Sequence, residues 1–246
     1  MDVVICRDAA EVGRVAADRV IEHLEGITTP VIGLATGSSP LSLYAELAQR
    51  AKDGTFSFEH GVGFALDEYV GIDIAHPESY RSVINRTVVE PFGMEAGRVN
   101  VPDGLADDLD AAAAAYDDSI DEAGGVDVQI LGIGSNGHIG FNEPFTSFSS
   151  RTHIVKLTDQ TREDNARFFN SLDEVPTHAA TQGLGTIMDS RCAVMVATGE
   201  GKADAIKAMI EGPVAIRCPA SILQFHPNVI VVIDEAAASK LEYPHL

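Results

Sequence analysis

Short apolar runs alternate with amphipathic segments along most of the chain, and this alternation limits the fold more than any other feature. The runs are nearly continuous in their apolar character, as strands are when helices cover both faces of a parallel sheet. The expected strands are residues 3–6, 31–34, 62–66, 126–133, 153–157, 193–197 and 229–233. The expected helices are residues 9–24, 41–52, 77–88, 106–123, 158–170, 181–189 and 201–210. The pattern predicts an α/β fold with a Rossmann-like, mainly parallel sheet and helices on both faces.

The length and composition favour a single domain over residues 1–246. Hydrophobic residues make up 45% of the chain and aromatic residues only 6%, so we expect an aliphatic core. No apolar stretch approaches the roughly 18–20 residues that span a bilayer, and the N-terminus lacks the pattern of a secretory signal. Cys6, Cys192 and Cys218 are an odd number without metal-like spacing, which is typical of reduced thiols in a cytoplasmic protein.

The charge of the chain excludes some partners. Lys and Arg number 17 and Asp and Glu 37, which gives a formal net charge of −20. Such a chain is repelled by nucleic acid and by anionic membranes, and no basic cluster offsets this, so we expect neither as a partner. Because cations are scarce, each Lys or Arg near a glycine-rich loop becomes a candidate ligand for an anionic substrate.

The segment GIGSNGHIGFNEP, residues 132–144, directly follows an apolar run that ends at Leu131. Glycines at a strand exit allow a sharp turn and the close approach of a ligand to the backbone. Asn136, His138 and Glu143 add an amide, an imidazole and a carboxylate, the groups needed to move protons on a small polar substrate. A lone histidine in a turn is more often structural, but three polar groups after a buried strand reverse that preference. No nucleophile elbow, HExxH or CxxC motif is present, so we expect neither an acyl-enzyme nor a metal.

The segment ALDEYVGI, residues 65–72, places two carboxylates at the end of another apolar run. Asp67 and Glu68 are adjacent, so in extended backbone their side chains point to opposite faces. One carboxylate can therefore face a cleft and act as a base while the other is structural. The alternative is an ordinary acidic strand end, which is common in a chain with 37 acidic residues.

A third segment, GLATGSSP at residues 33–40, precedes the expected helix at 41–52. Thr36, Gly37 and Ser38 would lie near the N-terminus of that helix, where free N–H groups and the helix dipole attract an anion. The alternative is an ordinary serine cap of the helix. The segment is neither a Walker A loop nor GxGxxG, so it does not imply a nucleotide.

Two single cations lie beside these motifs. Arg167 is on the expected helix at 158–170, and Lys202 opens the expected helix at 201–210 after the glycine-rich TGEG. An Arg binds a phosphate in a bidentate manner and a Lys binds it as a point charge. Each is equally well explained as a surface cation when it is considered alone.

Taken together, these segments resemble the glucosamine-6-phosphate deaminase family, also called glucosamine-6-phosphate isomerases. The matching stretches are GLATGSSP, LDEYVGI, HPESYRSVI, GIGSNGHIGFNEP, SRTHIVKLTDQTREDNARFF, GLGTIMDSR, TGEGKADAIKAMIEGPV and SILQFHPNVIVVID, which extend from about residue 31 to residue 234. The resemblance implies the sugar-phosphate isomerase/deaminase type of α/β fold. It also implies cofactor-free conversion of glucosamine 6-phosphate and water to fructose 6-phosphate and ammonia, a step of amino-sugar catabolism.

The resemblance further implies the roles of individual residues. His138 promotes opening of the sugar ring with the help of Glu143 and Asn136, and Asp67 removes the proton from C2. The residues implied to bind the phosphate are Thr36, Gly37, Ser38, Arg167 and Lys202. Remote phosphate binding would fix the sugar against both catalytic groups.

The chain departs from the family pattern at two places. Many members have Asp where this chain has Asn136, and Asn supplies no negative charge, so Glu143 would carry more of the stabilisation of an imidazolium and the pH optimum would move. Longer members have an allosteric site for N-acetylglucosamine 6-phosphate, with basic residues after the GHIxFNEP motif and a C-terminal extension. The corresponding positions here are His153 and Val155, and the chain ends at Leu246, so we expect constitutive activity.

Two other readings compete with this one. A 6-phosphogluconolactonase would share the fold and the phosphate loop, but that family typically continues its glycine–histidine motif with a SLFP-like segment and does not need LDEYVG. A sugar-phosphate sensor of a transcription regulator would carry a helix-turn-helix, for which there is no room before Val31, and a degenerate binder would be expected to lose Asp67 or His138. The sequence leaves open whether the protein is a monomer or a homo-oligomer.

Overall fold

The computed structural model describes residues 1–243; residues 244–246, which include the chain end at Leu246 used above, lie outside the described part. Its main element is a seven-stranded sheet with the order β1-β10-β9-β6-β2-β3-β5. The strands are β1 (Asp2–Cys6), β2 (Val31–Leu34), β3 (Val62–Ala65), β5 (Val99–Asn100), β6 (Val128–Leu131), β9 (Cys192–Ala197) and β10 (Val229–Asp234). All neighbouring pairs in this sheet are parallel. The predicted mainly parallel sheet is therefore confirmed.

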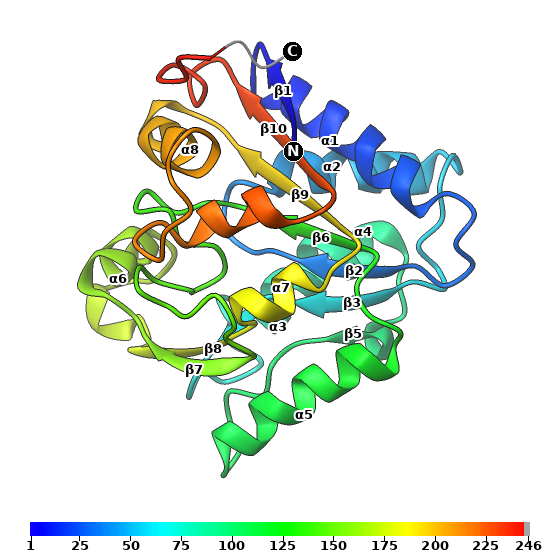
Figure 1. Cartoon of the computed structure of the whole chain (residues 1–246). Coiled ribbons are helices and arrows are strands. Elements are labelled where there is room, and N and C mark those ends of the chain that lie inside the picture. Colours follow the sequence, from blue (N-terminus) through cyan, green and yellow to red (C-terminus); the bar gives the residue numbers. More distant parts are fainter. Residues whose placement is uncertain (244–246) are drawn as a thin grey trace.

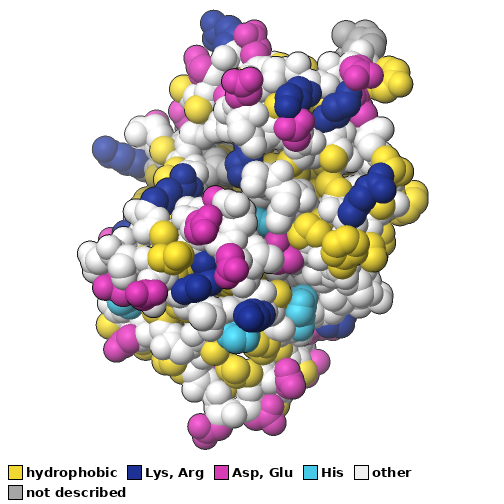
Figure 2. All heavy atoms as spheres, turned by 90° about the vertical axis from the view of Figure 1, so that its left-hand side faces the viewer, with side chains coloured by type: hydrophobic (Ala, Val, Ile, Leu, Met, Phe, Trp, Pro, Cys, Tyr) yellow, Lys and Arg dark blue, Asp and Glu magenta, His cyan; other side chains and the backbone are white. Residues whose placement is uncertain are grey.

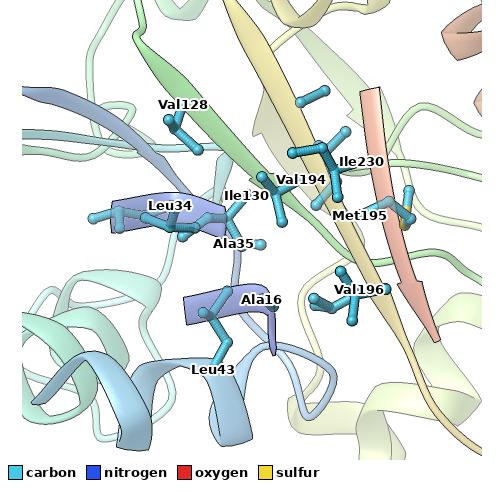
Figure 3. Packing of buried hydrophobic residues seen from close by; sticks show 14 of the residues in the cluster. Ala16, Leu34, Ala35, Leu43, Val128, Ile130, Val194, Met195, Val196 and Ile230 are labelled. Carbon is cyan, nitrogen blue, oxygen red and sulfur yellow. The ribbon is translucent and has the colours of Figure 1, made fainter. Parts of the chain in front are cut away.

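The three central strands of this sheet are buried along their whole length, which explains their apolar sequences. Every residue of β2, β6 and β9 is buried. Figure 3 shows Leu34, Ile130 and Val194 on these three neighbouring strands, in the same cluster as Ala16 and Leu43 from the first two helices. The core is aliphatic at this point, as the composition predicts.

Helices cover both faces of the sheet. The α-helices are α1 (Ala9–Leu24), α2 (Leu41–Lys52), α3 (Tyr80–Ile84), α4 (Glu90–Phe92), α5 (Leu109–Glu122), α6 (Asp159–Asn165), α7 (Leu184–Met188) and α8 (Ala203–Ile210). Helices α1 and α2 connect strands in one direction across the sheet, whereas α5 and α8 connect strands in the opposite direction. Because such crossovers are right-handed, the two pairs lie on opposite faces (Figure 1).

The packing of α1 against α2 positions the loop that precedes α2. Helix α1 begins after Asp8, whose side chain accepts a 2.8 Å hydrogen bond from the N–H of Glu11. At Gly13 the two helices touch: a Cβ there would lie 2.6 Å from backbone atoms of Ser42. The start of α2 is thereby held close to α1, and the loop that begins at Thr36 is fixed between β2 and α2.

A second, smaller sheet was not expected from the sequence. It is antiparallel, with the order β4-β8-β7, and consists of β4 (Asp67–Tyr69), β8 (His178–Thr181) and β7 (His153–Lys156). The strand expected at 153–157 exists, but it belongs to this sheet. The helix expected from Thr181 is wrong at its start, because Thr181 ends β8 opposite Asp67 and the helix begins at Leu184. Pairing on both sides makes the alanine-rich β8 a strand despite its weak strand propensity.

Three other expected helices differ from the structure. The segment expected at 77–88 begins only at Tyr80, after the cap Ser79, and continues as a π-helical turn over Asn85–Val89. The helix expected at 158–170 ends at Asn165 and is followed by a 3₁₀ turn over Ala166–Phe168. The helix expected at 106–123 is α5, and one of its Asp residues is buried. This residue, Asp117, accepts hydrogen bonds from Thr152 and Thr186.

Charged side chains of both signs are distributed over the visible surface. On the face shown in Figure 2, acidic side chains are scattered and interspersed with Lys and Arg rather than gathered in one patch. Cys6, Cys192 and Cys218 are buried and unpaired. In the part of the chain that the structure describes, none of the helices has the length and apolar character needed to cross a bilayer.

Candidate active site

The motifs identified in the sequence meet in one cavity at the carboxyl ends of the strands, as parallel α/β sheets predict. The expected site residues that line it are Thr36, Gly37, Ser38, Asp67, His138, Arg167 and Lys202. They come from the loop after β2, the start of β4, the loop after β6, the turn after α6 and the start of α8. Asn136 and Glu143 do not line the cavity but lie behind His138, whose ring and backbone they contact.

The two carboxylates of the DEY segment point in different directions. Asp67 lines the cavity. The carboxylate of Glu68 instead accepts hydrogen bonds from the N–H groups of Tyr69, Tyr80 and Arg81 at 2.8, 2.9 and 3.0 Å. Glu68 therefore ties β4 to the start of α3. The expectation that one carboxylate faces a cleft while the other is structural is confirmed.

Asp67 is held in surroundings that favour its protonated form. The side chain is buried, with 5% of its surface exposed. Burial and the neighbouring carboxylate of Glu68 raise the pKa of Asp67 to about 8, and a hydrogen bond from Thr36 opposes this shift. A carboxylate with a raised pKa is a stronger base once it has lost its proton, so Asp67 is suited to removing a proton from carbon near neutral pH.

Two glycines in the 132–144 segment let the imidazole and the carboxylate approach. The ring of His138 lies directly on Gly134, where a Cβ would be 2.2 Å from the imidazole. Gly140 has a φ of +56°, and a Cβ there would be 2.9 Å from Oγ1 of Thr181 and 3.5 Å from Oδ2 of Asp67. Both glycines therefore have a structural cause: a side chain at Gly134 would displace the ring of His138, and one at Gly140 would crowd the hydroxyl of Thr181 in a backbone conformation that favours glycine.

Glu143 is a fixed anion beside His138. Its Oε2 atom lies 3.7 Å from Nδ1 of His138 and accepts a 2.8 Å hydrogen bond from the amide of Asn136. Its Oε1 atom accepts hydrogen bonds from the hydroxyls of Thr158 and Thr161. Burial alone would raise the pKa of Glu143, but His138, Thr161 and Asn136 together lower it to about 2. The carboxylate is therefore ionised at neutral pH and placed to stabilise a protonated ring.

Asn136 forms hydrogen bonds to both His138 and Glu143. Its Oδ1 atom accepts a 3.1 Å hydrogen bond from the backbone N–H of His138, and its amide nitrogen donates to Glu143. In the structure it binds the backbone of His138 and the carboxylate of Glu143, so it is a positioning residue.

The other end of the cavity holds the expected phosphate-binding residues. The guanidinium of Arg167, in the 3₁₀ turn after α6, donates a 3.2 Å hydrogen bond to the hydroxyl of Ser38. Lys202, at the start of α8, is half-buried; burial lowers its pKa, and Asp164 partly opposes this shift. The alternative reading of the loop as a serine cap is wrong, because α2 is preceded by Pro40 without any side-chain cap bond. No hydroxyl of the loop is therefore used to cap α2.

Several residues of the cavity wall were not expected from the sequence: Tyr80, Phe141, Thr161, Asp164 and Asn165. The last three share the segment of Arg167, and Phe141 lies within the 132–144 motif, so proximity to a motif was a usable signal for them. No local signal marked Tyr80, which α3 brings to the cavity. Within residues 1–243, no group of three or more His, Cys, Asp or Glu side chains is arranged to hold a metal ion.

Comparison with known proteins places the chain in a family. Residues 7–231 match the model of glucosamine-6-phosphate isomerases/6-phosphogluconolactonase. The glucosamine-6-phosphate deaminase of Cutibacterium acnes is 55% identical over 241 residues, which cover 98% of this chain and 92% of the relative. That of Pseudarthrobacter chlorophenolicus is 54% identical over 242 residues, covering 98% and 93%.

Solved structures agree with this grouping. A monomeric glucosamine-6-phosphate deaminase superposes with a TM-score of 0.94 at 40% identity, over 97% of this chain and 99% of the other. The 6-phosphogluconolactonase of Trypanosoma cruzi superposes with a TM-score of 0.78 at 17% identity, over 98% of this chain and 97% of the other. At this low identity the lactonase shares the fold, whereas the deaminases share both the fold and the sequence.

Proposed function

The chain belongs to the family of glucosamine-6-phosphate isomerases and 6-phosphogluconolactonases, and we propose that it converts glucosamine 6-phosphate and water to fructose 6-phosphate and ammonia in the cavity described above. The observation that carries this proposal is the meeting of three groups in one cavity: a buried carboxylate, an imidazole backed by an anion, and a pair of cations. These groups correspond to the three needs of an amino-sugar phosphate, which must be anchored, opened and deprotonated.

The phosphate anchors the sugar at the end of the cavity formed by Arg167, Lys202 and the loop of Thr36, Gly37 and Ser38. Arg167 already donates to Ser38, so its guanidinium is aimed at the loop before a ligand arrives. Lys202, at the start of α8, adds a second positive charge to this cavity. Because binding energy from a non-reacting group fixes the rest of the substrate, this anchor places the sugar ring between His138 and Asp67.

His138 opens the ring. It takes the proton of the C1 hydroxyl and returns a proton to the ring oxygen, so the hemiacetal becomes an open-chain aldose without net proton change. The charged intermediate state of the imidazole is stabilised by Glu143, which remains anionic because its pKa is lowered to about 2. Asn136 and Thr161 keep this anion in place through their hydrogen bonds.

Asp67 then moves the proton that isomerises the sugar. As a carboxylate it removes the proton from C2 of the open aldose; the electron pair of that C–H bond forms a C1=C2 double bond while the π pair of the C1 carbonyl moves to O1, which takes up a proton from solvent, and an enolamine results. When Asp67 returns its proton to C1, the nitrogen lone pair forms the C2=N bond of an iminium sugar, which water hydrolyses to fructose 6-phosphate and ammonium. The raised pKa of Asp67 suits a group that must both accept and hold a proton between these steps.

The test separates the two steps with two variants. Asp67→Asn should bind the sugar phosphate but abolish exchange of the C2 proton with solvent deuterium, measured by NMR. His138→Gln should slow ring opening, so a substrate locked in the open form should be less affected than the cyclic sugar. Near-normal C2 exchange in Asp67→Asn would show that the role given to Asp67 is wrong.

We also propose that the protein works in the cytoplasm as a monomer or a homo-oligomer, without nucleic acid or membrane partners. Three unpaired buried cysteines suit a reducing compartment, and the formal charge of −20 opposes binding to polyanions.

The lactonase alternative is less well supported, because the hydrolysis of a lactone has no need for a base directed at carbon such as Asp67.

A further inference from the structure

Asp234, the last residue of β10, has a carboxylate to which the proposed reaction assigns no role. Strands β9 and β10 are parallel neighbours (Figure 1), and their register places Ile233 opposite Ala197, the last residue of β9. Asp234 therefore lies level with the loop TGEG, residues 198–201, that follows β9. This loop leads to Lys202 in the wall of the cavity.

Hydrogen bonds of the Gly199 backbone join Asp234 to Lys202. The N–H of Gly199 donates to both carboxylate oxygens of Asp234, each at 3.0 Å. The carbonyl oxygen of Gly199 accepts a 3.1 Å hydrogen bond from the N–H of Lys202, which closes the 3₁₀ turn Glu200–Lys202. The peptide groups on both sides of Gly199 therefore set the direction in which the Lys202 side chain leaves the backbone.

The backbone of Gly199 needs an external support to keep this geometry. Its φ of +87° and ψ of 153° lie in a region that is essentially restricted to glycine. A Cβ there would meet no atom within 4 Å, so the need for glycine comes from the backbone angles and not from crowding. Glycine is also the residue with the greatest conformational freedom, so a hydrogen bond from outside the loop is required to select one conformation. The carboxylate of Asp234 provides that bond.

The carboxylate of Asp234 is itself held in place. Its Oδ1 atom also accepts a 2.7 Å hydrogen bond from the N–H of Ala237, in the turn that follows β10. The backbone of Asp234 lies within the sheet, paired with Cys6 of β1. The end of β10 is therefore a fixed support for the loop that carries Lys202.

We propose that Asp234 is a positioning residue for phosphate binding: through Gly199 it holds the turn that directs Lys202 into the cavity. The inference rests on the proposed function, since it takes the anion bound by Lys202 to be the phosphate of the sugar. Burial lowers the pKa of Lys202, and the charges that also act on it are those of Asp164 and Arg167. Asp234 therefore supports Lys202 by hydrogen bonds to the backbone rather than by its charge.

The test compares Asp234→Ala with Asp234→Asn. In Asp234→Ala the N–H of Gly199 loses its acceptor and the turn is no longer fixed, so Kd for inorganic phosphate should rise about 5–10-fold. KM for glucosamine 6-phosphate should rise by the same factor, while kcat changes little. Asp234→Asn keeps an acceptor oxygen for Gly199 and should restore most of the affinity, which a role of the charge would not allow. Isothermal titration calorimetry measures Kd, and ammonia release measures KM and kcat.

Two further variants make the test independent of the folding of Asp234→Ala. Glu235→Ala is the matched control, because it removes the exposed acid next to Asp234 and should leave Kd and KM unchanged. Gly199→Ala keeps the N–H but strains the backbone at a positive φ, so it should weaken phosphate binding as Asp234→Ala does. Wild-type phosphate affinity in Asp234→Ala, or in Gly199→Ala where Asp234→Ala does not fold, would overturn the proposal.

A double-mutant cycle shows whether Asp234 acts through Lys202. In a chain that already carries Lys202→Met, Asp234→Ala should cause no further rise in Kd for phosphate or in KM, because the charge to be positioned is gone. An additional 5–10-fold rise in that background would mean that Asp234 acts on phosphate binding by another route, and the proposal would be wrong.

These measurements also separate the inference from the proposed function, because phosphate binding requires no turnover. If Asp234→Ala weakens phosphate binding as expected but the wild-type protein releases no ammonia from glucosamine 6-phosphate, the positioning role stands and the proposed activity fails. If the wild-type protein releases ammonia and Asp234→Ala has the phosphate affinity and KM of the wild type, the activity stands and the positioning role fails.

Discussion

The Oε2 atom of Glu143 lies 3.7 Å from Nδ1 of His138 and is held there by the amide of Asn136. This pair lies at the edge of the cavity: His138 lines it, whereas Glu143 is behind the ring. The anion therefore acts on the substrate only through the imidazole. Since the pKa of Glu143 is lowered to about 2, its carboxylate is ionised throughout the neutral pH range.

Replacing this anion should slow the reaction without weakening binding. In Glu143→Gln the protonated ring loses its charge partner, so kcat should fall about 100-fold while KM changes little. The measurement is steady-state ammonia release from glucosamine 6-phosphate. Glu163→Gln removes one acid from the exposed side of α6 and should behave as wild type. A large rise in KM with an unchanged kcat would show that Glu143 binds substrate rather than orienting His138.

The raised pKa of Asp67 should be visible in the stability of the protein. An aspartate titrates near 3.9 in an unfolded chain, whereas Asp67 has a pKa of about 8 in the folded protein. Between these values the folded state binds a proton that the unfolded state has lost, so the stability contributed by the neutral carboxyl is complete below about pH 4 and is lost as the pH rises through about 8.

Asp67→Asn removes this titration and keeps a neutral side chain of similar shape. The variant should therefore be more stable than wild type above pH 8, by a few degrees in Tm, with the difference shrinking as the pH falls toward 4. Thermal unfolding of both proteins at several pH values measures this. A difference in Tm that is the same at pH 4 and pH 9 would contradict the raised pKa.

The parallel sheet was predictable from the sequence because each inner strand carries its own signal. A strand such as β9 is buried on both faces, and its six residues are all apolar or small. Helix α1 was predictable to the residue because an Asp cap and an apolar face mark its start locally. In these elements the local pattern and the tertiary environment agree.

The second sheet was not predictable in this way. Its strand β8 is HAAT, whose alanines favour helix, and it becomes a strand only because β4 and β7 pair with it on either side. The partners are far away in the chain, so no local pattern records the pairing. The same limit explains Tyr80: its place in the cavity depends on the backbone N–H of Tyr80 binding Glu68, a contact that spacing alone does not reveal.

Most of the site was predicted through the family resemblance, because the residues taken one by one left an ordinary structural explanation open for Asp67, Arg167 and Lys202. The glycines of the motifs were a local signal: Gly134 lies against the ring of His138, and Gly37 has a φ of +85° in the loop after β2. What the sequence could not provide was the direction of each side chain. The adjacency of Asp67 and Glu68 predicted opposite faces, but only the paired β4 strand and the start of α3 determine which of the two faces the cavity.

Lys202 offers a test of the phosphate end of the cavity. Lys202→Met keeps an unbranched side chain one atom shorter and removes the charge, so KM for glucosamine 6-phosphate should rise about 10–100-fold, the worth of one hydrogen bond to a charged group. Turnover of glucosamine without phosphate, measured at high concentration, should not change. Lys156→Met, at the exposed end of β7, is the control for loss of a positive charge. Equal effects of Lys202→Met on both sugars would show that Lys202 does not bind the phosphate.

The expectation that the enzyme is active without an allosteric activator depends on two residues of β7. The two positions that are basic in allosteric members are His153 and Val155 on β7. The ring of His153 is engaged at Nδ1 with the carbonyl oxygen of Arg151 at 2.8 Å, and Val155 has no charge, so these two positions offer a second sugar phosphate little to bind. Velocity should therefore depend hyperbolically on the concentration of glucosamine 6-phosphate, and N-acetylglucosamine 6-phosphate should not activate. Ammonia release with and without the acetylated sugar measures this. A sigmoidal curve that becomes hyperbolic on its addition would mean that an activating site exists despite the lost cations.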